Sequence, residues 1–188
     1  MMKKELPKWK RTGSRTAYKG RVHVLEYDVE LLDGSPSKYE VDHSDGKAVA
    51  VLFKTKDDEI ILSHQYRFPL DEWIYDLPGG GSPASETLEE GAKREALEEV
   101  GLVPNKLVKL ATFYPNPART DWTATTFFCD DYEEAKATET DPSEVVEMIK
   151  MPVAEFAKLV DEGHIVDPML LVAWHTAIRK KLIVLKDK

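Results

Sequence analysis

A dense group of glutamates lies between Gly80 and Leu102, in the run GGSPASETLEEGAKREALEEVGL. Glu95, Glu98 and Glu99 have the i, i+3, i+4 spacing, so on a helix they project within about one third of its circumference. Carboxylates crowded in this way repel one another unless protons or cations intervene. Oxygen-only ligands suit Mg²⁺ or Mn²⁺, which bind few carboxylates and complete their coordination with water and substrate phosphate. The run therefore predicts a divalent-metal site.

A helix must hold these carboxylates, and the sequence marks where it begins and ends. Thr87 and Glu90 have the T-x-x-E spacing of a capping box, and Gly101 is a natural C-terminal stop. The predicted helix also carries an apolar stripe on an adjoining face: Leu88, Ala92, Ala96 and Val100. The carboxylates should therefore lie at the edge of the buried face.

An acidic helix is in general more often a solvated surface, with basic residues such as Lys93 as partners. Here the spacing G-x5-E-x7-R-E-A-x-E-E-x-G-L resembles the Nudix box of the Nudix hydrolases. Eight positions match: Gly80, Glu86, Arg94, Glu95, Glu98, Glu99, Gly101 and Leu102. Ala96 departs from the bulky aliphatic residue of most members, which affects packing and not the proposed ligands.

The resemblance implies that Mg²⁺, or Mn²⁺, is held by residues in and just before the box: Gly79, Gly80, Glu86, Glu95, Glu98 and Glu99. Glu95 and Glu99 would bind metal most directly, through their carboxylates. Glu98 would assist as ligand or base, and Glu86 would hold a further ion. Arg94 would orient the box carboxylates by charge-assisted hydrogen bonds. Glycine at 79 and 80 would let a backbone carbonyl approach the metal.

Features outside the box resemble the branch of the family that hydrolyses ADP-ribose and other nucleotide sugars. These are the QYR run ending at Arg67, the run WIYDLPGG over 73–80, and Pro117, fifteen residues after the box. The resemblance implies that Arg67 binds phosphate, since guanidinium matches phosphate oxygens bidentately, with Arg119 as a weaker candidate. Without the family context, Arg67 would equally well pair with Asp71 or Glu72 on the surface.

Two positions depart from that branch, and both could shift specificity away from ADP-ribose. Asp76 stands in place of a glutamate, and Gly79 in place of an alanine.

A carboxylate must also accept a proton from the attacking water. Glu144 has the position expected from the resemblance. The sequence leaves open several other bases, namely Glu98, Glu139, Asp141 and Asp121. Aromatic candidates for stacking the nucleobase are Trp9, Tyr18, Tyr39 and Phe68.

Composition limits the classes of partner. The net charge of −8 over 188 residues argues against a broad nucleic-acid surface. No stretch approaches a membrane span or a signal peptide, so we expect no membrane association and a cytoplasmic location. The single cysteine, Cys129, follows two phenylalanines and is predicted to be a small core residue.

The strand and helix patterns predict a small antiparallel appendage over residues 1–46 and a Nudix domain over residues 47–188. In the appendage, apolar residues alternate from Leu25 to Leu31, and 38–43 reads as a returning strand. In the domain, strands are expected at 48–53, 59–66, 73–77, 107–113, 122–129 and 145–151, and further helices at 153–162 and 168–182. This order fits an α+β fold in which a mixed sheet is sandwiched between helices (α/β/α), as the resemblance implies. In related enzymes the appendage swaps or packs across a two-fold axis. The resemblance therefore implies that residues 1–46 serve dimerisation and base binding, in a homodimer with a shared base pocket.

The leading hypothesis is a Mg²⁺-dependent hydrolase that splits a nucleoside diphosphate sugar of the ADP-ribose, ADP-glucose or GDP-mannose type. The products would be a nucleoside monophosphate and a sugar phosphate. One alternative is a house-cleaning hydrolase of dinucleoside polyphosphates or oxidised nucleotides. An alternative of another class is a non-catalytic Nudix-fold module that senses nucleotide sugars.

Overall fold

The computed structural model describes residues 6–137 and 146–185. The predicted base Glu144, together with Glu139 and Asp141, lies outside the described residues. The chain forms two compact units. The first, which we call the N-terminal unit, comprises Met1–Asp45 and Asn116–Trp122; the second, the helical unit, comprises Gly46–Pro115 and Thr123–Lys188.

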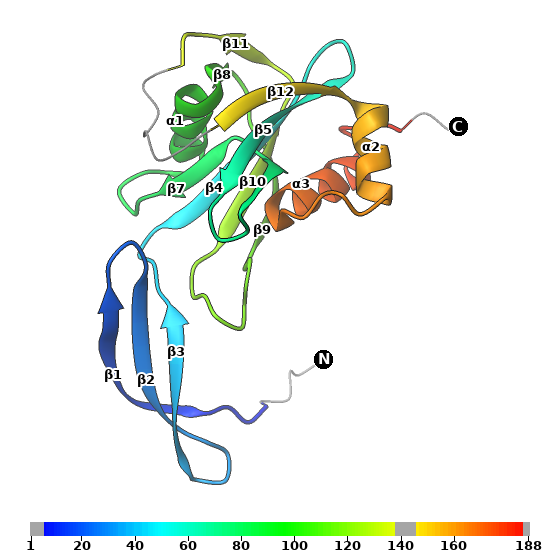
Figure 1. The fold of residues 1–188 in the computed structure, drawn as a ribbon. Coiled ribbons are helices and arrows are strands. Elements are labelled where there is room, and N and C mark those ends of the chain that lie inside the picture. The colour runs from blue at the N-terminus through cyan, green and yellow to red at the C-terminus, as the bar shows by residue number, and fades with distance from the viewer. Residues whose placement is uncertain (1–5, 138–145, 186–188) are drawn as a thin grey trace. The chain divides into compact units, whose positions relative to one another are not determined.

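The N-terminal unit is built on a three-stranded antiparallel sheet of order β1-β2-β3 (Figure 1). Its strands are β1 (Lys10–Lys19), β2 (His23–Glu30) and β3 (Pro36–Asp42). β2 and β3 lie where apolar alternation predicts them, and Val29 and Val41 are buried. The sequence patterns do not predict β1, because its ten residues are almost all exposed and lack an apolar face.

The helical unit contains a seven-stranded mixed sheet with the core order β12-β5-β4-β10-β9. β4 and β10 run parallel, and the other strand pairs are antiparallel, including β6 on β5 and β7 on β4. The strands are β4 (Lys47–Lys54), β5 (Glu59–Arg67), β6 (Glu72–Asp76), β7 (Gly79–Ser82), β9 (Val108–Phe113), β10 (Ala124–Cys129) and β12 (Val146–Pro152). A separate two-stranded ribbon joins β8 (Leu102–Pro104) to β11 (Tyr132–Glu134).

Helices cover both faces of this sheet (Figure 1). They are α1 (Leu88–Val100), α2 (Val153–Asp161) and α3 (Pro168–Arg179). One apolar cluster joins α1 to alternate residues of β4, such as Val49 and Val51, and the opposite cluster joins α2 and α3 to Leu52. Both faces of β4 are therefore buried, which explains its continuous apolar run. The predicted α/β/α sandwich with a mixed sheet is confirmed.

Besides β1, the sequence patterns miss three short strands. β7, β8 and β11 have three or four residues each, too few for a period to be read. β11 lies within an acidic stretch whose composition is typical of a loop. Cys129 is 1% exposed, as predicted, and burial raises the pKa of its thiol to about 11. Across residues 6–137 and 146–185, no helix is long and apolar enough to cross a membrane.

Candidate active site

Helix α1 begins and ends where the sequence predicts. The Thr87 hydroxyl accepts a hydrogen bond from the Glu90 amide at 3.2 Å, and the Thr87 amide donates to the Glu90 carboxylate at 2.9 Å. These two bonds form the capping box, and the bonds from Thr87 lower the pKa of Glu90. Gly101 ends the helix with a φ of 65°, in the left-handed region that favours glycine.

Gly91 lets α1 pack closely on β7, a role that the sequence patterns above do not predict. A Cβ at this position would lie 2.7 Å from the Ser82 hydroxyl and 3.0 Å from a carboxylate oxygen of Glu86. Glycine inside a helix costs roughly 1 kcal/mol relative to alanine, so its presence in the box signals such a close approach. Among the residues that the structure describes, the buried Ser82 hydroxyl has no hydrogen-bond partner.

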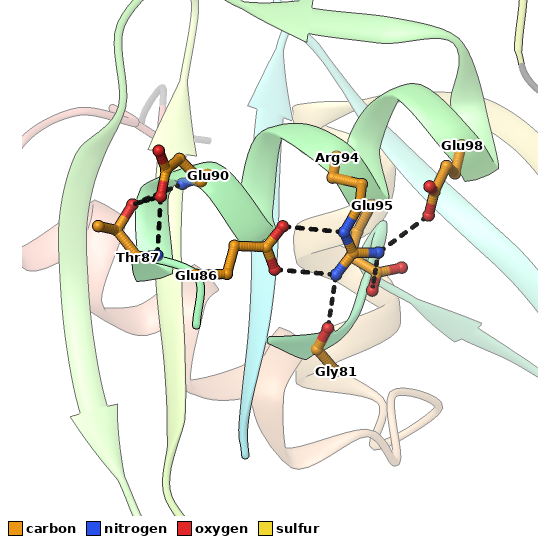
Figure 2. Close-up of polar contacts among 7 residues, drawn as sticks. All are labelled: Gly81, Glu86, Thr87, Glu90, Arg94, Glu95 and Glu98. Carbon is orange, nitrogen blue, oxygen red and sulfur yellow. Dashed lines mark hydrogen bonds and ion pairs between the residues drawn. The ribbon is translucent and has the colours of Figure 1, made fainter. Parts of the chain in front are cut away.

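Arg94 gathers three of the box carboxylates around one guanidinium (Figure 2). Its Nε and Nη2 donate to the two carboxylate oxygens of Glu86 at 3.0 and 3.1 Å. Its Nη1 donates to Glu95 at 2.8 Å and to Glu98 at 3.0 Å, and its Nη2 also donates to the Gly81 carbonyl at 2.7 Å. The bond to Glu86 is the main cause of a raised Arg94 pKa, although partial burial opposes it. The guanidinium of Arg94 therefore compensates the negative charges of these three carboxylates within the protein itself.

The glycine segment lies against the remaining carboxylates. The Gly79 amide donates to Glu99 at 2.9 Å, and a Cβ on Gly80 would lie 2.6 Å from a carboxylate oxygen of Glu95. A Cβ on Gly79 would overlap the Val49 carbonyl oxygen and lie 2.6 Å from the Cα of the next residue in β4. An alanine at position 79 would therefore require β7 to move away from β4.

The donor set fits a hard divalent cation in its chemistry, since every candidate ligand is an oxygen. The side chains of Glu95 and Glu86 are 13% and 20% exposed, and that of Glu98 is 39% exposed, so the group lies at a partly open edge. Within the described part of the chain, no three His, Cys, Asp or Glu side chains already converge as one ion would require.

Arg67 pairs with the buried carboxylate of Asp76 and not with Asp71 or Glu72, the surface partners considered from the sequence. Its Nη2 bonds Asp76, whose other oxygen accepts from the Leu77 amide at 2.8 Å. Asp71 instead accepts a hydrogen bond from the Tyr66 hydroxyl.

Asp167, the N-cap of α3, lies near the same pair. Its pKa is raised to about 7, mainly by burial and then by the negative charge of Asp76.

Pro117 and Arg119 belong to the N-terminal unit, although they follow β9 in the sequence. They line a cavity of about 360 Å³ within that unit, with Trp9, Arg11, Tyr27 and Tyr39. The rings of Trp9 and Tyr39 lie 6.0 Å apart edge to face, and the Arg11 guanidinium lies 4.5 Å above the Tyr27 ring. Of the four aromatic candidates, Tyr18 and Phe68 are exposed and do not line this cavity. Asp121, a candidate base, bonds His43.

Several known proteins are similar to this chain in sequence. The family model of the NUDIX domain matches residues 45–170. An ADP-ribose pyrophosphatase of Bacillus subtilis (strain 168) is 36% identical over 143 residues, which is 74% of this chain and 76% of the relative. A methanol dehydrogenase activator of Bacillus methanolicus is 30% identical, over 83% of this chain and 85% of the relative.

Two further proteins match this chain at lower sequence identity. A GDP-mannose pyrophosphatase of Yersinia enterocolitica is 24% identical, over 76% of this chain and 80% of the relative. A crystal structure described as an ADP compounds hydrolase superposes with a TM-score of 0.82 and covers 95% of this chain and 96% of that chain. Its sequence identity is 23%, so this likeness concerns the fold.

Proposed function

Because the chain belongs to the Nudix family, we propose that it hydrolyses the pyrophosphate bond of a nucleoside diphosphate sugar. A nucleoside monophosphate and a sugar phosphate would be the products. The observation that carries the proposal is the gathering of Glu86, Glu95 and Glu98 around Arg94 at the partly open edge of α1. The relatives named for ADP-ribose and GDP-mannose support this class of substrate.

Nudix hydrolases generally use divalent metal ions, and Mg²⁺ is our proposal for this chain, with Mn²⁺ as a substitute. The ligands would come from Glu95, Glu99 and Glu98, with Glu86 for a further ion and the backbone of Gly79 or Gly80 beside them. When bound, the metal would lower the pKa of the attacking water and neutralise phosphate charge. The guanidinium of Arg94 would hold Glu86, Glu95 and Glu98 in place through charge-assisted hydrogen bonds.

Arg67 and Arg119 are proposed to bind the phosphates. Asp76 accepts a hydrogen bond from Nη2 of Arg67, and a guanidinium has further N–H donors that would bind a phosphate oxygen. A carboxylate must accept the proton of the attacking water, and Glu144 is the proposed base, with Glu98 as the alternative within α1.

The cavity of the N-terminal unit is the proposed site for the nucleobase. Trp9 and Tyr39 supply aromatic faces, and stacking on aromatic rings tolerates different bases. Pro117 lines the same cavity. We propose that the chain acts as a homodimer, since this unit packs across a two-fold axis in the enzymes that the sequence resembles and two-fold dimers are the commonest oligomers.

A substrate panel tests the proposal. Purified protein is incubated with ADP-ribose, ADP-glucose or GDP-mannose, with Mg²⁺, with Mn²⁺ and with EDTA, and nucleoside monophosphate is measured by chromatography. We expect metal-dependent release of monophosphate from at least one of these sugars. Cleavage of dinucleoside polyphosphates or oxidised nucleoside triphosphates alone would contradict the proposed substrate class. Tight binding of a nucleotide sugar by calorimetry, without any hydrolysis, would instead identify a sensing module.

A further inference from the structure

Segment 116–122 connects two strands of the helical-unit sheet, yet its hydrogen bonds tie it to the N-terminal unit. It follows β9, which ends at Phe113, and precedes β10, which begins at Ala124. Four interactions hold it within the N-terminal unit: Tyr39 Oη to the Ala118 carbonyl (2.6 Å), the Asp42 amide to the Arg119 carbonyl (2.8 Å), the Ser44 amide to Asp121 (3.3 Å), and His43 to Asp121 (2.6 Å). The backbone that carries Pro117 and Arg119 is therefore positioned by β3 and the residues just after it.

His43 is placed between two carboxylates. Its Nδ1 lies 2.6 Å from Asp121 Oδ2, and its Nε2 lies 3.2 Å from Asp45 Oδ1. Ionised carboxylates only accept hydrogen bonds, so both contacts are satisfied together only when both ring nitrogens carry protons. The hydrogen bond with Asp121 is also the main cause of a raised His43 pKa. The geometry therefore favours the imidazolium form.

Asp121 is the stronger of the two partners. Its side chain is 33% exposed, whereas that of Asp45 is 94% exposed and therefore well screened by water. The His23 ring meets the His43 ring edge to face at 5.3 Å. The charged and titratable side chains around the depression that contains His43 are Lys19, Arg21, His23, Asp42, Asp45 and Asp121. Lys19, Arg21 and His23 line the same depression, and the two carboxylates supply the attraction that raises the pKa of His43.

We propose that His43 and Asp121 are positioning residues that fasten segment 116–122, and that the fastening is strongest when His43 is an imidazolium. Its effect on catalysis rests on the proposed function, in which Pro117 and Arg119 contact the substrate. Because the pKa of His43 is raised in the folded protein, the stabilisation is present at low pH and is lost as the pH rises through that raised value. Substrate affinity should fall over the same interval, while the box residues continue to react.

Hydrogen exchange of the Asp42 amide, which donates to Arg119, tests the fastening without any substrate. In Asp121→Asn and in His43→Gln we expect this amide to exchange about tenfold faster than in the wild type at pH 6, since a hydrogen bond to a charged group is lost. The wild-type protection factor should fall as the pH rises, whereas both variants should show no such step. His175→Gln, an exposed histidine of α3, is the matched control and should behave as the wild type. Unchanged Asp42 exchange in both variants would overturn the proposal whatever the substrate is.

Steady-state kinetics on the best substrate then test the role in positioning. We expect KM to rise about tenfold in either variant, and kcat to change less than about twofold in His43→Gln, because affinity and not the box chemistry is affected. The double variant should lose no more than either single variant, since the two residues act as one pair. Faster exchange with unchanged KM would show a structural bond without a positioning role and would leave the proposed function standing. Absence of hydrolysis by the wild type would remove the proposed function and leave the exchange result valid.

Discussion

Arg94 meets Glu86 across 8 residues of sequence and Glu98 across 4, whereas His43 meets Asp121 across 78. The box region is thus organised by spacing along one helix and the loop before it. The N-terminal unit is organised by the pairing of β3 with a distant segment. A periodic pattern can predict the first kind of arrangement and carries no information on the second.

Replacing Gly79 with alanine should have the largest effect on the box region. The new Cβ would overlap the Val49 carbonyl oxygen, so β7 would have to move away from β4. We expect a loss of about 3 kcal/mol in the free energy of unfolding, measured by urea denaturation. Gly81→Ala is the control, because Gly81 lies in the same strand and a Cβ added there would meet no atom within 4 Å. Equal stability of the two variants would mean that β7 does not pair so closely.

Arg94→Met should be the next largest change. It removes the shared cation and leaves the carboxylates of Glu86, Glu95 and Glu98 facing one another without it. We expect a loss of about 2 kcal/mol in stability without metal and a drop of roughly 100-fold in kcat/KM. Lys93→Met, an exposed neighbour, controls for the loss of one positive charge. If added Mg²⁺ fully restored both stability and activity, Arg94 would not be needed to orient the carboxylates.

Asp167→Asn tests a smaller effect in the helical unit, one that depends on pH. Since the Asp167 pKa is raised to about 7, the folded protein holds this proton more tightly than the unfolded chain, and stability falls as the pH rises from about 4 to about 7. The amide of asparagine can still accept the N-cap bond from Leu170. We therefore expect the variant to be about 1 kcal/mol more stable than the wild type at pH 8 and not at pH 4, by thermal unfolding. Exposed Asp161→Asn should show no such difference, and equal profiles for the two variants would refute the shifted pKa.

Tyr39→Phe should give the smallest effect and belongs to the N-terminal unit. It removes the hydrogen bond from the hydroxyl to the Ala118 carbonyl and keeps the ring that faces Trp9. We expect the Asp42 amide, which donates to the Arg119 carbonyl of the segment, to lose about 0.5 kcal/mol of protection against hydrogen exchange, with little change in kcat. A loss of turnover as large as that of Arg94→Met would erase the distinction between the two regions.

Much of the fold could be predicted from the sequence because its signals are local. Thr87, Glu90 and Gly101 mark the ends of α1, and the continuous apolar run over 48–53 predicts a strand buried on both faces. Strand β1 could not be predicted, because its exposed residues carry no apolar period. The same division applies to the site, where the gathering of box carboxylates on one edge follows from helical spacing.

The features of the site that could not be predicted from the sequence depend on contacts between separate elements. Gly91 approaches Ser82 of β7, and Arg67 finds Asp76 across the β5–β6 pair. The assignment of Pro117 to the N-terminal unit follows from bonds to β3, which no spacing within either segment reveals. Of these contacts, the sequence offered a signal for that of Gly91. Glycine inside a helix is unfavourable relative to alanine, so its presence there indicates a close approach by another element.

The carboxylates of α1 are proposed to carry the metal chemistry, and Glu99→Gln tests this role most directly when it is compared with Glu89→Gln. Both variants remove one negative charge from the same helix, but Glu99 bonds the Gly79 amide whereas Glu89 is exposed in the first turn. With saturating Mg²⁺ and the best nucleotide sugar, we predict that Glu99→Gln lowers kcat by at least about 100-fold with a wild-type circular dichroism spectrum, and that Glu89→Gln stays within about twofold. Activity of Glu99→Gln within about twofold of the wild type would contradict this claim.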